Sequence, residues 1–319
     1  MTEKGTVITL SSGYQMPLLA YGLGTTWKNH TNHTKNTFKQ CIKLALHAGY
    51  RHLDEAEMYH TETACGEAVK EWLSVKEGDK TNKEDFSNNR SDLFITSKIS
   101  YSANEPINGV LNGCKNSLER LGLDYIDLYL IHAPFEDRLL RPLETVWLEM
   151  ENLVKEGLVR SIGVSNCNIH HLKRILKIAN IKPSVNQIEC HPYLPQKDLS
   201  IFCEKHHIVL TSFSGLTPIT DPIARGGPVD QVVKELSVKY QKTDSQILQR
   251  WLIEMKKGIV TTSTNSKRIL LPLEIYDFSL TRAERKDIEL AGRRKMRRRW
   301  FGEWLGKAEE ETICIQSKM

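Results

Sequence analysis

The chain has 319 residues, of which 40% are hydrophobic and 26% are charged, and its net charge is +5. This composition is typical of a soluble globular protein, and no apolar run approaches the roughly 18 residues that cross a bilayer, which excludes a membrane-spanning protein. The first residues contain no apolar signal segment and the seven cysteines form no CxxC pair, so we expect a cytoplasmic protein with reduced thiols.

The first fifty residues predict a hairpin, a strand and a helix, in that order. Residues 6–17 contain two short alternating apolar runs around a Ser-Ser-Gly turn, which is typical of a β-hairpin. Residues 18–22 are expected to form the next strand, followed by the loop Gly24-Thr25-Thr26-Trp27. Apolar residues spaced by three and four predict an amphipathic helix over residues 37–48, and Gly49 ends it.

The stretch Gly49 to Gly66 is the first that carries candidate chemistry. A short apolar strand, residues 50–53, ends at Asp54, and Tyr59 follows just before a helix expected over residues 61–75. Taken alone, the stretch also fits an ordinary strand–turn–helix junction whose acid caps the helix. However, a carboxylate at a strand end and a phenol on the next loop lie where α/β proteins place their binding and catalytic groups.

Three later apolar strands also end in polar side chains. Residues 93–98 end in Lys98, residues 126–132 end in His132, and the strand that begins at residue 159 ends in Ser165-Asn166. A buried strand is expected to end in a turn residue, and not in a lone lysine or histidine. Together with Asp54, these strand ends therefore predict an active site.

Strands and helices alternate along the rest of the chain. The polar residues 76–90 are expected to form a solvent-exposed loop without a function of its own. About eight strands alternating with helices predict a parallel (β/α)8 TIM barrel, with residues 1–319 as a single domain, and the lack of a Gly-x-Gly-x-x-Gly after a strand argues against a Rossmann domain. The remaining expected pairs are residues 93–98 with 107–121, 126–132 with 143–156, 159–164 with 170–179, 184–188 with 198–207, 208–213 with 229–239, and 258–262 with a final helical region.

Several of these stretches resemble the aldo-keto reductases. The stretch Gly49 to Gly66 is similar to the first signature of that family, except that Glu55 stands where the family usually has a small residue. Ser165-Asn166, the run of residues 185–193 and residues 263–268 follow in the family's order and spacing, so the resemblance covers nearly the whole chain. It implies a barrel with an N-terminal hairpin and a C-terminal substrate loop, NADPH as the cofactor, a small-molecule carbonyl substrate and a monomer.

Within the family, three motifs resemble the fungal α-keto amide and conjugated polyketone reductases. They are Gly24-Thr25-Thr26-Trp27, His132-Ala133-Pro134-Phe135 and Val260-Thr261-Thr262-Ser263. This narrower resemblance implies a reductase of activated ketones, namely α-keto amides, α-diketones, conjugated polyketones or keto lactones.

The resemblance assigns a catalytic role to each of the four residues that follow the first strands. Tyr59 is expected to donate the proton, and Lys98 to lower the pKa of its phenol, which is about 10 when free. Asp54 is expected to hold Lys98 in a buried ion pair, and His132 to hydrogen-bond the carbonyl oxygen. A plain ion pair in the barrel core would explain Asp54 and Lys98 but would leave Tyr59 and His132 unexplained.

The resemblance also implies a set of cofactor residues. Phe213 stands where the family usually has a tyrosine that stacks on the nicotinamide, and stacking needs only a flat ring. Gly215 replaces a usual proline, and a more mobile loop is expected there. Thr262 and Pro272 replace a lysine and an asparagine near the 2′-phosphate, which Ser263 and Arg268 are still expected to hold. The implied cofactor-binding residues are Thr25, Thr26, Ser165, Asn166, Gln187, Phe213, Ser214, Leu216, Thr262, Ser263, Thr264 and Arg268.

The candidate substrate residues are Trp27, His132, Phe135 and Trp300. Tyr101, Phe301 and Trp304 are weaker candidates, because an aromatic side chain is as often part of a core as of a pocket. The C-terminal segment from Trp300 is expected to overhang the barrel mouth. No metal site is predicted.

Three other functions compete with carbonyl reduction. A sugar or polyol (arabinose-type) dehydrogenase of the same family is the strongest alternative. A non-enzymatic nucleotide-binding subunit on the same barrel is disfavoured by His132, which that branch of the family does not keep. The basic run Arg293 to Arg299 could indicate nucleic-acid binding, but no nucleic-acid module accompanies it, and a solvated surface near an anionic cofactor explains it better.

Overall fold

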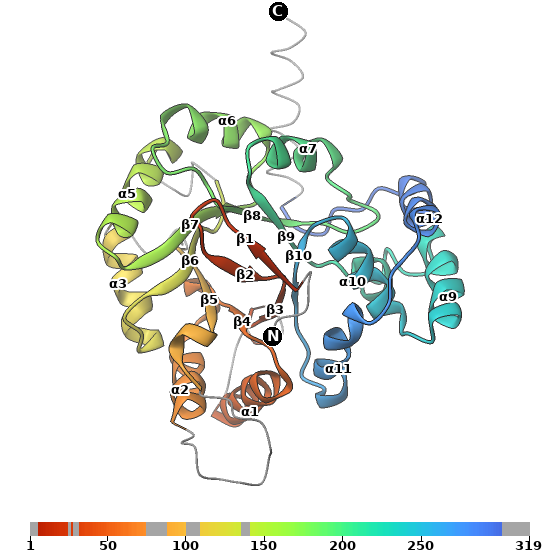
Figure 1. Ribbon diagram of the computed structural model, residues 1–319, viewed down its shortest axis with the longest axis horizontal. Coiled ribbons are helices and arrows are strands. Elements are labelled where there is room, and N and C mark those ends of the chain that lie inside the picture. Colours follow the sequence, from red (N-terminus) through yellow and green to blue (C-terminus); the bar gives the residue numbers. More distant parts are fainter. Residues whose placement is uncertain are drawn as a thin grey trace, which may run out of the picture.

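The computed structural model describes residues 6–24, 27, 32–74, 88–99, 109–134 and 141–301. Its centre is a closed barrel of parallel strands, with the helices around the outside (Figure 1). The barrel strands are β3 (Leu19–Gly22), β4 (His52–Asp54), β5 (Phe94–Ile99), β6 (Ile126–Ile131), β7 (Val159–Ser165), β8 (Val185–Glu189), β9 (Val209–Phe213) and β10 (Gly258–Thr261). They follow one another around the barrel in chain order, and β10 closes it by pairing with β3. The predicted (β/α)8 barrel is confirmed.

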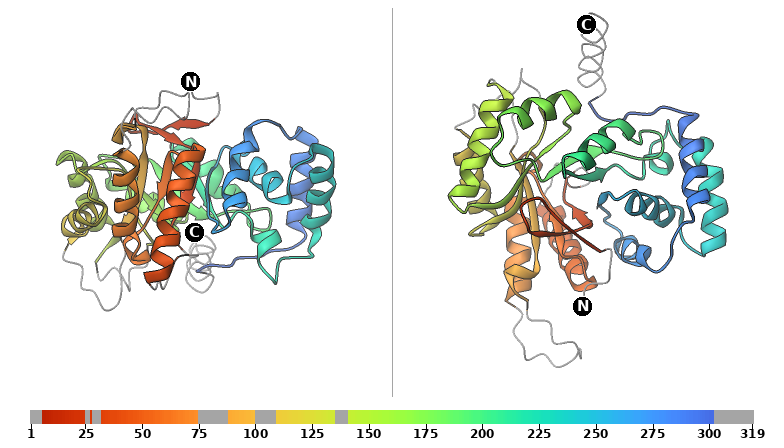
Figure 2. Two further views of the ribbon diagram at one scale, coloured as in Figure 1. Left: turned by 90° about the horizontal axis from the view of Figure 1, so that it is seen from below. Right: turned by 45° about the horizontal axis from the view of Figure 1, so that its top comes forward.

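The helices cover the outer face of the barrel. They are α1 (Asn32–Ala48), α2 (Glu62–Leu73), α3 (Gly109–Leu121), α5 (Leu143–Lys155), α6 (Ile169–Ile178), α7 (Lys197–Lys205), α8 (Thr217–Thr220), α9 (Pro228–Tyr240), α10 (Asp244–Glu254), α11 (Ser266–Leu270) and α12 (Arg282–Arg293). In both views of Figure 2 the blue helix α12 lies beside the cyan helix α9, and Lys239 and Glu284 pair across them at 2.6 Å. Among the described residues, no helix has both the length and the apolar character needed to cross a bilayer.

Helix α10 was not predicted, although its start carries a clear local signal. Thr243 and Gln246 form a capping box, in which the Thr243 hydroxyl accepts from the Gln246 amide at 3.3 Å and the Gln246 side chain accepts from the Thr243 amide at 2.9 Å. The spacing Thr-x-x-Gln before an apolar run is the sequence signature of such a cap. Recognising it would have placed this helix between α9 and β10.

Helix α1 begins five residues before its predicted start at residue 37. The first turns contain only polar residues, so apolar periodicity does not reveal them. Instead, Lys35 and Lys39 pair with Glu67 of α2 at 2.9 Å and 3.3 Å, which fastens the two helices together. Most of the predicted loop over residues 76–90 lies outside the described residues, and a short 3₁₀ turn, Arg90–Asp92, precedes β5.

The predicted hairpin closes the amino-terminal end of the barrel. Strands β1 (Val7–Thr9) and β2 (Gln15–Pro17) pair in antiparallel fashion and lie across the barrel in Figure 1. Met16 is fully buried in a small cluster with Leu10 and Phe94. Because the hairpin covers this end, we expect the active site at the carboxyl ends of the strands, where barrels of this kind carry it.

Candidate active site

The centre of the candidate site is a buried ion pair between two neighbouring strands. The Lys98 ammonium in β5 lies 2.6 Å from Asp54 Oδ1 at the end of β4 and donates a second hydrogen bond, of 2.8 Å, to the Glu55 carbonyl. The two side chains are 0% and 3% exposed. Burial favours the neutral form of Lys98, but Asp54 and Tyr59 outweigh it and raise the pKa of the ammonium above its usual value.

The Tyr59 ring lies against this ion pair. Tyr59 is the last residue of the short 3₁₀ turn Glu57–Tyr59, and the centroid of its ring lies 5.1 Å from Lys98 Nζ. The His132 ring, directly after β6, meets it edge-on at a centroid distance of 5.6 Å. A Cβ atom at Gly24 would lie 2.8 Å from the Tyr59 ring, so any other residue at position 24 would force the ring to shift. The structure therefore brings the four expected catalytic residues together, and Gly24 is a supporting residue that the sequence analysis missed.

The pKa of Tyr59 differs from the expectation. Burial raises the pKa of the phenol, and the nearby Lys98 ammonium lowers it, but burial is the larger effect and the pKa lies above its ordinary value. Lys98 thus lowers the pKa of the phenol as expected, but the expectation did not include the larger effect of burial. As a result, Tyr59 keeps its proton at neutral pH and is available as a proton donor.

Glu55 is the residue that departs from the first signature of the aldo-keto reductases, and it supplies a second buried carboxyl group directly after Asp54. It is 0% exposed, and its Oε2 accepts hydrogen bonds from the Thr61 hydroxyl at 2.7 Å and the Ala56 amide at 3.3 Å. Burial raises the pKa of Glu55 well above its usual value, which favours the neutral acid and leaves Asp54 as the counterion of Lys98. The folded protein keeps a proton that the unfolded chain releases, so the stability from this group is lost as the pH rises through the raised pKa.

Three polar side chains from β7 and β8 complete this part of the barrel mouth. The Asn166 amide donates to the His132 carbonyl at 2.9 Å, and Ser165 Oγ donates to the Gln187 carbonyl at 2.8 Å. The Gln187 amide nitrogen reaches across the barrel and donates to Asp54 Oδ2 at 2.7 Å. The sequence analysis placed these residues at the site but did not predict that Gln187 contacts Asp54.

The loop after β9 begins with Phe213 and Ser214, both half-buried. A Cβ at Gly215 would lie 2.5 Å from Leu252 of α10, so the replacement of the family's proline allows a close approach of this loop to the helix. Leu216 then occupies the position directly before the short helix α8, without a side-chain cap. The loop is thus packed against α10, a contact that the expectation of a more mobile loop did not anticipate.

The loop after β10 carries the expected phosphate-binding residues. Ser263 Oγ accepts from the Asn265 amide at 3.1 Å, and Asn265 in turn caps α11 by accepting from the Arg268 amide at 3.1 Å. The Arg268 side chain is exposed, and within the described part of the chain its guanidinium has no hydrogen-bond partner. Thr262 is half-buried and Thr264 is exposed. The expected residues Thr25 and Thr26 lie outside the described residues.

The start of the C-terminal segment lies over the barrel mouth, in the place expected for it. The backbone amides of Arg299 and Trp300 donate to the buried Glu189 carboxylate, at the end of β8, at 2.8 Å and 2.9 Å. The Trp300 indole donates to Ser214 Oγ at 3.0 Å. Glu189 was not predicted as a site residue, although an acid at the end of a buried strand is the same signal that identified Asp54.

The expectation for Trp27 needs correction. Its side chain is 2% exposed and meets Phe38 of α1 edge-on at 4.9 Å, so it packs in the core and does not line an open pocket wall. Phe135, the other expected apolar wall, lies outside the described residues, as do Tyr101 and Trp304. Of the expected substrate residues, the structure therefore brings His132 and Trp300 to the mouth.

The basic run of residues 293–299 contacts its own chain. Arg297 pairs with Asp221 at 2.5 Å, and the Lys295 ammonium donates to the Ile223 carbonyl at 2.6 Å. Both partners belong to the segment between α8 and α9. These contacts hold the last described residues against the loop that follows β9.

The sequence profile of the Aldo/keto reductase family matches residues 18–292. The chain belongs to the aldo/keto reductase family. Reductases of this family use NADPH, so the chain is an NADPH-dependent oxidoreductase.

Individual relatives cover most of this reductase. The NADP-dependent D-sorbitol-6-phosphate dehydrogenase of Malus domestica is 36% identical over 298 residues, which are 86% of this chain and 90% of the relative. The glyoxal reductase of Bacillus subtilis is 35% identical over 291 residues, covering 90% of this chain and 93% of the relative. The structure of a Bombyx mori aldo-keto reductase in complex with NADP superimposes with a TM-score of 0.76 at 31% identity, covering 89% of this chain and 92% of the other.

Proposed function

We propose that this aldo/keto reductase reduces ketones activated by a second, adjacent carbonyl, with Tyr59 as the proton donor. The substrate class comprises α-keto amides, α-diketones, conjugated polyketones and keto lactones. The observation that carries the chemistry is the position of the buried Tyr59 ring, 5.1 Å from Lys98 Nζ and edge-on to the His132 ring at 5.6 Å. This arrangement supplies a proton and a hydrogen-bond donor at one place in the barrel mouth.

Each residue of this group has one task in the reduction. When bound at the mouth, NADPH would supply the hydride for the carbonyl carbon. Tyr59 gives its proton to the carbonyl oxygen as negative charge develops there, and the Lys98 ammonium stabilises the phenolate that remains. Asp54 keeps Lys98 charged and fixed, and His132 donates a hydrogen bond to the same oxygen and orients the substrate.

The residues at the mouth fit the nicotinamide end of the cofactor. Ser165, Asn166 and Gln187 provide amide and hydroxyl groups along the ends of β7 and β8. Because the Gln187 amide nitrogen already donates to Asp54, its Oε1 is the atom we assign to the carboxamide N–H of the nicotinamide. Phe213 supplies the flat ring for stacking. Gln187 thereby connects cofactor placement to the ion pair.

The exposed Arg268 and the neighbouring Ser263 fit the 2′-phosphate of NADPH. We expect Arg268→Ala to weaken the binding of NADPH by about ten- to a hundredfold, the effect of losing one charge-assisted hydrogen bond, and to change NADH binding little. Fluorescence titration of both cofactors measures this. Lys267→Ala is the matched control, because Lys267 is an exposed cation on the same short helix. Equal losses for NADPH and NADH would show that Arg268 does not contact the phosphate.

Two considerations support activated ketones as substrates. An electron-poor carbonyl needs less polarisation, and one relative is named for its action on glyoxal, a compound with two adjacent carbonyls. The three motifs shared with the fungal α-keto amide and polyketone reductases point to the same class. The sugar-alcohol alternative is supported by the relative named as a sorbitol-6-phosphate dehydrogenase. A polyol needs several hydroxyl partners, whereas Trp300 presents an aromatic ring to the mouth.

The substrate class is tested by comparing kcat/KM across carbonyl compounds with NADPH. We expect the best α-diketone, keto lactone or α-keto amide to exceed any aldose by at least about 100-fold, the scale of one or two unpaired polar groups. The measurement follows NADPH consumption by its absorbance over a panel of both classes. An aldose or polyol that reacts as efficiently as the best dicarbonyl would favour the dehydrogenase alternative.

A further inference from the structure

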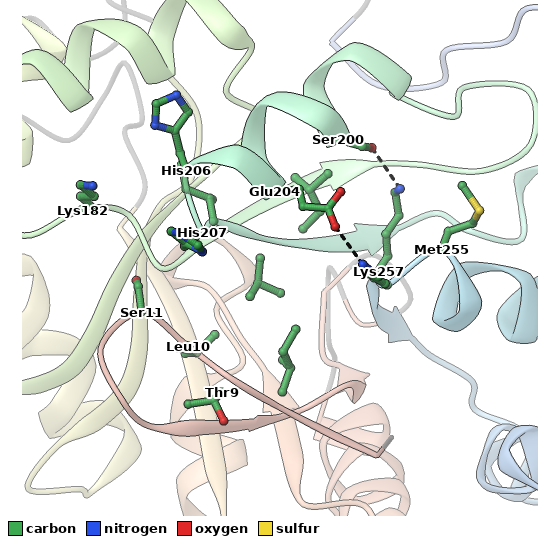
Figure 3. A pocket seen from close by; sticks show the side chains of 15 residues that line it. Thr9, Leu10, Ser11, Lys182, Ser200, Glu204, His206, His207, Met255 and Lys257 are labelled. Carbon is green, nitrogen blue, oxygen red and sulfur yellow. Dashed lines mark hydrogen bonds and ion pairs between the residues drawn. The ribbon is translucent and has the colours of Figure 1, made fainter. Parts of the chain in front are cut away.

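A second cavity lies at the amino-terminal end of the barrel, away from Tyr59 and Lys98. It has a volume of about 630 Å³, within the range of small-molecule sites. Figure 3 shows it between the hairpin and the two turns that lead into β9 and β10. Its apolar lining consists of Ile8, Leu10, Ile208, Val209, Leu210 and Met255.

The polar lining of this cavity is basic. Three lysines, Lys182, Lys256 and Lys257, contribute to it together with two histidines, and Glu204 is the one carboxylate among the lining residues. Glu204 already pairs with Lys256 at 2.8 Å on the exposed rim. Lys257 also feels the charge of Glu204 but forms no close ion pair with it, and a single carboxylate cannot neutralise all three lysines, so the lining keeps a net positive charge.

Lys257 is the decisive side chain. Lys256 has a left-handed backbone with a φ of 56°, and this turn at the end of α10 directs the chain so that Lys257 is only 2% exposed. The Lys257 ammonium donates to Ser200 Oγ at 3.0 Å (Figure 3), and no carboxylate of the described residues lies within ion-pair distance of it. A buried ammonium is costly without a counter-charge, and a serine hydroxyl supplies only a dipole.

We propose that this cavity binds a small amphipathic anion, a carboxylate or phosphate monoester with an apolar body. The anionic group pairs with Lys257 next to Ser200, and Lys182 on the rim adds a second positive charge. The body of the ligand lies on the accessible apolar surface that Ile8 of the hairpin shares with Val209 and Met255. This site is separate from the one that holds NADPH and the carbonyl substrate.

Calorimetric titration of the full chain, with and without saturating NADPH, tests the proposal. The probes are octanoate and octyl phosphate, which distinguish the two anionic groups, with octanol and inorganic phosphate as single-feature controls. We expect at least one of the two amphiphiles to bind, and Lys257→Met to weaken that binding by about tenfold or more. Lys205→Met, an exposed lysine on α7 outside the cavity lining, should leave it unchanged.

Thr9→Trp is a second variant that fills the cavity from the exposed face of the hairpin and leaves Lys257 in place. It should also abolish binding, and it remains informative if Lys257→Met does not fold, as judged by thermal melting. Absence of binding by both amphiphiles, equal binding of octanol or of inorganic phosphate, competition by NADPH, or binding unaffected by Lys257→Met and Thr9→Trp would each overturn the proposal.

Discussion

Tyr59→Phe is expected to lower kcat for carbonyl reduction by at least about 100-fold and to leave NADPH binding nearly unchanged. The Tyr59 hydroxyl carries the proton that is donated, and the Tyr59 ring lies beside Lys98 and His132 at the centre of the candidate site. Removing the hydroxyl leaves the developing alkoxide without its proton donor. The ring itself, which packs on Gly24, is retained in the variant. Steady-state kinetics with the best dicarbonyl substrate and a separate NADPH titration measure the two effects.

Tyr276→Phe is the matched control for this variant. Tyr276 has a buried hydroxyl without a hydrogen-bond partner in the described part of the chain, and it lies in the turn after α11, outside the candidate site. Its loss should leave both kcat and NADPH binding unchanged. Retention of more than about a tenth of wild-type kcat by Tyr59→Phe would be too much activity for the loss of a general acid, and would assign the proton to another group.

Lys98→Met is expected to lower the free energy of unfolding by about 3–5 kcal/mol and to abolish activity. The substitution keeps most of the apolar volume of the side chain but removes the cation from an ion pair whose members are 0% and 3% exposed. Asp54 is then left as a buried carboxylate held by the Gln187 amide. Chemical denaturation of the cofactor-free protein measures the change.

The double variant Asp54→Asn, Lys98→Met separates the buried charge from simple loss of packing. The asparagine side chain is neutral and its oxygen can still accept from Gln187, so the double variant should recover much of the stability lost by Lys98→Met. It should remain inactive, because the ammonium beside Tyr59 is still missing. Losses that simply add in the double variant would show that the two side chains do not stabilise each other.

The barrel and the position of the four central residues could be predicted because each signal is local. Asp54 ends β4, Lys98 is the next-to-last residue of β5 and His132 directly follows β6, and parallel strands bring their carboxyl ends to one edge. Helix α10 was missed for a different reason. The signal that marks its start, the Thr243–Gln246 capping box, is made by polar residues, which a search for apolar spacing does not detect.

The remaining features of the site depend on contacts between distant parts of the chain. Gln187 and Asp54 are 133 residues apart, and no local pattern encodes their hydrogen bond. Glu189 also contacts His191, two residues away, but its hydrogen bonds to the Arg299 and Trp300 amides join residues 110 and 111 positions apart, and no local pattern encodes them. The raised pKa of Tyr59 could not be predicted either, because it depends on how much burial outweighs one neighbouring ammonium.

The way Glu189 holds the C-terminal segment has a consequence for the divergence of such enzymes. Its carboxylate binds the backbone amides of Arg299 and Trp300, and these amides are present whatever the side chains are, proline excepted. Mutation can therefore exchange the side chains at these two positions and keep both backbone hydrogen bonds, although a change of Trp300 removes its indole contact with Ser214. The ion pair between Asp54 and Lys98 lies on separate strands, β4 and β5, so changes at these two positions alter the wall of the barrel mouth without touching it.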